Sequence, residues 1–189
     1  MTTFGRTFVY GGLPLTTPTG KKQFDAMVAS SNPLDRLTAA DLLAGYVRLA
    51  SRPDADPLIR QPLQQYLQGL AQLRQDSSPA VSAWASYLLA TVLSGGDQKD
   101  RVVTEMAGSK DSTTRLLSLF AGNALAPARR QQLAQGLAGN EQDPTVKAAA
   151  NATVELLEQA STRPATQPAT PPSVPAGPPT TEPMGPAGF

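Results

Sequence analysis

The residues best suited to acid–base chemistry are two close pairs of aspartates, Asp54 with Asp56 and Asp97 with Asp100. Paired carboxylates serve as general acid and base when their environments separate their pKa values. Each pair, however, lies in a proline-rich or glycine-rich link just before a predicted helix. Aspartates at such places commonly accept hydrogen bonds from the free N–H groups of the helix start. We therefore expect these four residues to be caps or solvated side chains.

Histidine and cysteine are both missing from the 189 residues. Without histidine, no side chain ordinarily titrates near neutral pH, so the commonest general base, the serine triad and histidine-containing zinc sites are excluded. Without cysteine there are no disulfides, thiolate nucleophiles or thiolate metal sites. We expect a protein that is not an enzyme and that uses no metal or cofactor.

A phosphate-binding loop is the other chemical motif to consider, because Gly20 and Lys21 stand side by side in residues 15–22. Leu15 replaces the first glycine of that motif, and Lys22 replaces the hydroxyl residue that would hold magnesium. No buried strand precedes the segment. We therefore reject a phosphate-binding loop here.

The overall charge also limits the partners. Sixteen basic and fifteen acidic side chains give a net charge of +1, so no strong overall field attracts nucleic acid or an anionic membrane. No apolar run approaches the roughly 20 residues that span a bilayer, and the first residues lack the pattern of a secretory signal. We expect another protein as the partner, no nucleic acid, no membrane span and a cytoplasmic location.

The elements that would position any site are helices, which the pattern predicts from residue 21 to about residue 160. Helix-start signals occur at Asn32, Ser78, Asp111 and Asp143, and Pro62 is expected to start a further helix. The starts at Ser78, Asp111 and Asp143 are 33 and 32 residues apart, which is the length of two helices and two short turns. A nearly equal interval of this length indicates stacked helical pairs.

The last start carries the most specific motif, Asp143-Pro144-x-Val146-Lys147, followed by Ala150 and Val154. It resembles the HEAT-type repeat, whose units often open with Asp-Pro-x-Val-Arg and continue with alanine and leucine. The resemblance covers about residues 32–160. The other starts match the motif less closely: Asp111-Ser112-x-Thr114-Arg115, Ser78-Pro79-x-Val81 with Ser82 in the basic position, and Asn32-Pro33-x-Asp35-Arg36.

The resemblance also implies roles for the charged positions. In HEAT-type proteins the acidic and basic residues of the motif often bridge adjacent repeats. It follows from the resemblance that Asp111, Arg115, Asp143 and Lys147 form a structural ladder. Where Ser82 replaces the basic residue, the ladder would be interrupted.

The two ends of the chain differ from the repeats. Residues 1–20 contain Phe4, Phe8 and Tyr10 and are expected to form an extended aromatic arm, packed on the first helices or docked on a partner. Residues 161–189 hold half of the 18 prolines and are expected to be a disordered, proline-rich tail. Residues 21–160 are then the helical-repeat domain.

These observations predict a right-handed, all-α solenoid of about three and a half antiparallel helix pairs, used as a protein-binding scaffold or adaptor. Two alternatives are a HEAT-like domain for nucleic-acid binding or DNA repair, and a structural subunit of an assembly docked through the arm. The predicted partner-binding face consists of the polar positions on two repeat-opening helices: Arg115, Ser118, Lys147, Asn151 and Glu155.

Overall fold

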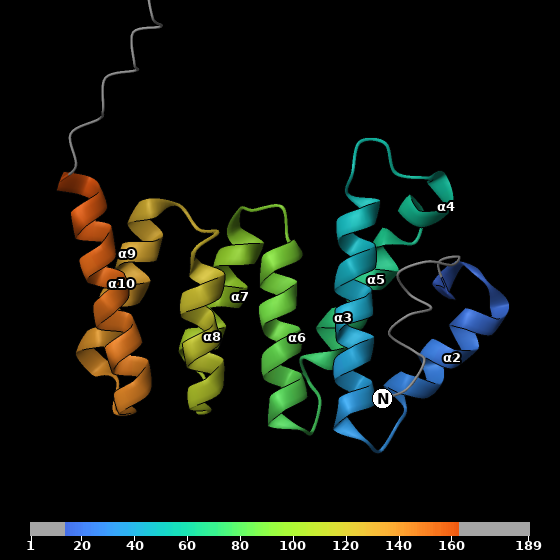
Figure 1. Cartoon of the computed structure of the whole chain (residues 1–189), viewed down its shortest axis with the longest axis horizontal. Helices are drawn as coiled ribbons and strands as arrows, with labels where there is room; N and C mark the ends of the chain where they lie inside the picture. Colours follow the sequence, from blue (N-terminus) through green and yellow to red (C-terminus); the bar gives the residue numbers. More distant parts are fainter. Residues whose placement is uncertain (1–13, 163–189) are drawn as a thin grey trace, which may run out of the picture.

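The computed structural model describes residues 14–162, and this part of the chain is helical with no strands (Figure 1). The predicted all-α fold class is confirmed. The elements in chain order are η1 (Pro14–Thr16), α2 (Pro18–Val28), α3 (Pro33–Ala50), α4 (Pro57–Arg60), α5 (Leu63–Leu73), α6 (Pro79–Val92), α7 (Asp97–Ala107), α8 (Ser112–Gly122), α9 (Pro127–Asn140) and α10 (Pro144–Thr162).

Three of the helices begin where the capping residues predict. The side chain of Asn32 accepts a hydrogen bond from the backbone N–H of Leu34, at 3.1 Å, and begins α3. Asp111 accepts from Thr114 at 2.7 Å and begins α8. Asp143 begins α10 by accepting from the backbone N–H groups of two of its first residues. Each such cap contributes about 1 kcal/mol by satisfying otherwise unpaired N–H groups.

The helices lie in two layers (Figure 1). One layer holds α3, α6, α8 and α10, and the other holds α5, α7 and α9. Consecutive helices pack as pairs, α3 with α5, α6 with α7 and α8 with α9, and α10 packs against both helices of the last pair. The helices of the first layer thus stand side by side. Helices α3, α6 and α8 are backed by α5, α7 and α9, and α10 is backed by α9, which precedes it in the chain.

The core consists of two clusters of buried side chains. The larger lies beneath α3, α5, α6 and α7 and includes Leu43, Leu70, Val81 and Val103. The smaller joins α8, α9 and α10 through Leu119, Ala134, Leu137 and Ala150. Leu133 is partly buried and packs against both clusters. Burial of an aliphatic side chain of this size contributes about 1.5–3 kcal/mol, so these clusters hold the layers together.

The boundary of the predicted N-terminal arm is wrong, because residues 14–20 are not extended. They form η1 and the first turn of α2. The Thr17 hydroxyl accepts a hydrogen bond from the N–H of Gly20 at 3.0 Å, and Pro18 takes the first helical position. The same combination of cap and proline begins α3, α4 and α10.

Other sequence-based expectations fall at or beyond the ends of the described residues. Phe4, Phe8 and Tyr10 lie outside them, as does the proline-rich segment after Thr162.

The helix expected to start near Pro62 is α5, which Pro62 separates from the short α4. No helix between residues 14 and 162 is long and apolar enough to cross a membrane.

Candidate binding groove

An arginine clamp connects α8 to the link that precedes α10. Arg115 donates two parallel hydrogen bonds to the carboxylate of Glu141, from Nε at 2.6 Å and from Nη2 at 2.8 Å. Its third nitrogen donates to the backbone carbonyls of Ser109 and Lys110, each at 2.9 Å. Glu141 in turn accepts from the backbone N–H of Asp143 at 2.8 Å. The side chain of one residue therefore holds the links on both sides of the α8–α9 pair.

The same device recurs at the first pair. Arg36 in α3 donates to the carboxylate of Asp76 at 2.7 and 3.0 Å and to the carbonyl of Ser30 at 2.6 Å. Asp76 accepts from the N–H of Ser78 at 2.8 Å. In both clamps the arginine stands four residues after the cap of its own helix. The acid stands two residues before the first residue position that caps the helix following the pair. Bidentate pairs of this kind have fixed geometry and are stronger than neutral hydrogen bonds.

The middle pair, α6 with α7, lacks the clamp, as the sequence predicts from Ser82. The hydroxyl of Ser82 instead donates to the carbonyl of Arg74, at 2.6 Å, within the preceding link. Arg74 also contacts Glu105 in α7 at 2.7 Å, which joins the first pair to the second. Between α7 and α9, the described residues hold one ion pair, Arg129 with Asp100 at 3.4 Å.

The predicted ladder therefore has different bonds from those that the resemblance implies. Asp111 and Asp143 cap their helices, and Arg115 bonds to Glu141, a residue that sequence reasoning missed. Lys147 is exposed, and its side chain makes no hydrogen bond or ion pair within residues 14–162. The signal that could have identified Glu141 is its position two residues before a cap, which Asp76 shares.

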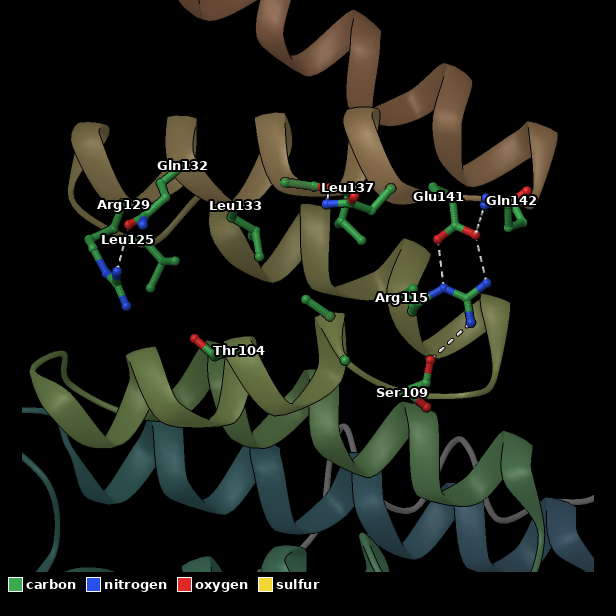
Figure 2. Close-up of a pocket in the computed structure, with 14 residues that line it drawn as sticks. Thr104, Ser109, Arg115, Leu125, Arg129, Gln132, Leu133, Leu137, Glu141 and Gln142 are labelled. Atoms are coloured by element: carbon green, nitrogen blue, oxygen red, sulfur yellow. Dashed lines mark hydrogen bonds and ion pairs between the residues drawn. The ribbon is translucent and has the colours of Figure 1, made fainter.

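A groove of about 650 Å³ lies between α7 and α9, over the end of α8 (Figure 2). Its apolar lining comes from Ala107, Leu125, Leu133 and Leu137. Figure 2 shows Arg129 and Gln132 at one end and Arg115, Glu141 and Gln142 at the other. The remaining polar lining is supplied by Thr104, Ser109 and Asn140, with Gly108 and Gly136 adding no side chain.

The charges at the two ends of the groove differ. At one end, the hydrogen bonds from Arg115, together with those from the backbone N–H groups of Asp143 and Gln142, lower the pKa of Glu141 from 4.5 to about 2. The pair therefore stays ionised and mutually neutralised at neutral pH. At the other end, Arg129 has half of its side chain exposed, and its contact with Asp100 is long. The positive charge at the Arg129 end is consequently more exposed and less tightly paired than that of Arg115.

The residues predicted to face a partner do not share one surface. Ser118 is completely buried and donates to the carbonyl of Arg115 at 2.6 Å, so its place on that face is wrong. Arg115 is held in the clamp at the end of the groove. Lys147, Asn151 and Glu155 are exposed along α10, away from the groove lining. A serine can be buried in a helix because its hydroxyl bonds to the backbone of the preceding turn.

The aspartate pairs occupy helix starts. Asp56 accepts from the N–H of Leu58 at 2.8 Å and caps α4, whereas Asp54 is exposed in the link before it. Asp97 and Asp100 lie in the first turn of α7, where their negative charges interact favourably with the positive end of the helix dipole. Residues 14–162 contain no group of three or more His, Cys, Asp or Glu side chains placed to hold a metal ion.

What the groove can do is bind. Its polar groups are amides, hydroxyls, guanidinium groups and a carboxylate already paired with arginine, and these donate and accept hydrogen bonds without titrating near neutral pH. Comparison of the chain with family models, curated proteins and solved structures finds no match.

Proposed function

We propose that the protein is a non-catalytic protein-binding scaffold or adaptor, built as a HEAT-type helical repeat, and that the groove between α7 and α9 receives a segment of its partner. The observation that carries this proposal is the groove itself, an apolar floor bordered by amide and guanidinium groups. A mainly apolar hollow with a few polar groups that fix orientation is the usual form of a ligand site.

The repeat architecture adds support. Side-chain caps recur before α3, α8 and α10, and the arginine clamp appears at equivalent positions of the first and third pairs. Stacked pairs of this kind present long surfaces made by several neighbouring units, which suits them to binding extended partners. The groove has this character because two successive second-layer helices form its sides.

Gly136 allows a direct test, because it lines the groove and a Cβ added there would meet no neighbouring atom within 4 Å outside its own helical turn. Gly136→Gln should therefore occupy the groove and leave the fold intact. Gly45→Gln is the matched control: Gly45 also has open space around it and lies inside α3, outside the groove. Full-length wild-type and variant chains are used as baits in lysate of the source cells.

The proposal expects one or more proteins that the wild type and Gly45→Gln retain and that Gly136→Gln loses. Thermal unfolding of each bait confirms that all three are folded. Proteins retained equally by all three baits would show that the groove is not the binding site. Recovery of nucleic acid that is released by salt, with no groove-dependent protein, would favour the nucleic-acid-binding alternative instead.

A further inference from the structure

The dimensions of the groove limit what fits along it. Its lining along α9 runs from Arg129 to Asn140, a rise of about 17 Å at 1.5 Å per residue. An extended chain advances about 3.4 Å per residue, so about five residues span this length. The apolar lining comes from single side chains, among them Leu133 and Leu137, with Gly136 beside them.

The amides on the border suit an extended backbone. The oxygen of Gln132 accepts from Arg129 at 2.7 Å, and the amide nitrogen of Asn140 donates to the carbonyl of Gly136 at 3.1 Å. Within residues 14–162, the amide nitrogen of Gln132 and the amide oxygen of Asn140 make no further hydrogen bond. One donor and one acceptor are thus left along the same side of the groove, as the N–H and C=O groups of an extended peptide require.

The charge distribution selects the side chains of that peptide. Glu141 neutralises Arg115 at one end, whereas Arg129 at the other end is half exposed and holds Asp100 only at 3.4 Å. Nε of Arg129 donates to Asp100 and Nη1 to Gln132, whereas Nη2 makes no hydrogen bond within residues 14–162 and is open to a ligand carboxylate. A carboxylate in the ligand is favoured at this end, and a lysine or arginine is disfavoured.

We infer that the groove recognises an extended peptide segment of about five residues that carries an Asp or Glu at the Arg129 end and apolar side chains over Leu133 and Leu137. This inference rests on the proposed function and names the chemistry of the partner. Apolar contacts supply the affinity, and the carboxylate fixes the direction in which the segment lies.

A random-peptide phage library selected on the immobilised full-length chain tests the inference. Peptides are enriched on the wild type and then compared on Gly136→Gln, Gly45→Gln, Arg129→Glu and Arg101→Glu. Arg101 is exposed on α7 and does not line the groove, so Arg101→Glu changes the net charge equally without altering the site. Affinities are measured with synthetic peptides from the enriched set, at low and high salt.

The expected result is an enriched motif with an acidic residue next to apolar residues, bound by the wild type and Gly45→Gln and lost on Gly136→Gln. Arg129→Glu should weaken binding roughly fivefold or more at low salt, and less at high salt, whereas Arg101→Glu should have little effect. Groove-dependent peptides without acidic enrichment would overturn this inference and leave the proposed function standing. Failure to recover any groove-dependent peptide would count against both.

Discussion

Arg115 and Glu141 are 26 residues apart in the chain and are joined by two hydrogen bonds of 2.6 and 2.8 Å. Arg36 and Asp76, 40 residues apart, are joined in the same way. Each arginine also holds the carbonyl of a serine in the link before its own helix. One side chain thus ties together the links on either side of a helix pair, at two places in the stack.

The first prediction concerns this clamp. Arg115→Met should lower the melting temperature by several degrees, because it leaves the carboxylate of Glu141 with only its backbone donors and frees two carbonyls. Arg129→Met, which removes an exposed and longer ion pair, is the control and should change the melting temperature little. Thermal unfolding followed by circular dichroism compares them. Equal losses in the two variants would show that the clamp adds no stability.

The second prediction concerns pH. The pKa of Glu141 is lowered from 4.5 to about 2 in the folded chain, so the stability it contributes is present above pH 4.5 and is lost as the pH falls toward 2. Unfolding near pH 3 should therefore take up about one proton more in the wild type than in Glu141→Gln. Urea unfolding at a series of pH values gives this difference. The same pH dependence in both proteins would contradict the assignment.

The third prediction distinguishes two neighbouring tyrosines whose rings are tilted by 38° to each other. The rings of Tyr46 and Tyr66 lie 5.1 Å apart, and burial raises the pKa of both. The hydroxyl of Tyr46 accepts from the N–H of Leu15 at 3.2 Å, whereas the buried hydroxyl of Tyr66 finds no hydrogen-bond partner among the described residues. Tyr46→Phe should lower the unfolding free energy by about 1 kcal/mol, and Tyr66→Phe should leave it unchanged or raise it. Urea unfolding distinguishes them, and a larger loss for Tyr66→Phe would refute the prediction.

The fourth prediction uses two helical glycines. Gly45→Ala should stabilise the fold by about 0.5–1 kcal/mol, because alanine favours the helix and nothing lies within 4 Å of the added carbon. At Gly122 the added carbon would lie 2.8 Å from Leu133 Cδ2. The leucine must then move away from the contacts it makes with both core clusters. Gly122→Ala should gain less than Gly45→Ala or lose stability, and an equal gain in urea unfolding would disprove the close contact.

The helix starts could be predicted from the sequence because their causes are local. A capping side chain and a proline at the first position act within a few residues, as at Asn32, Asp111 and Asp143. The same signal occurs at Thr17 and Pro18, inside the segment expected to be an extended arm, so the fold begins earlier than expected.

The contacts of the site could not be predicted in this way. Glu141 meets Arg115 only after α9 has turned the chain back, and the groove exists only where side chains from three helices surround one space. The burial of Ser118 depends on a hydrogen bond within its own helix that a polar–apolar pattern does not represent. Lys147 stands four residues after its helix cap, as Arg36 and Arg115 do. The described residues contain no helix start after α10, so they offer no acidic residue at the position that would pair with Lys147.

The missing clamp at Ser82 has a mechanical consequence. The first and second pairs are held by Arg36 and Arg74, and the third pair and α10 are held by Arg115. At the seam between the second and third pairs, the described residues add to the apolar packing one long ion pair, between Arg129 and Asp100. We expect bending of the molecule to concentrate at this seam, between one rigid unit formed by the first and second pairs and another formed by the third pair and α10. The groove lies in the seam, and its width would then change with the angle between the two units.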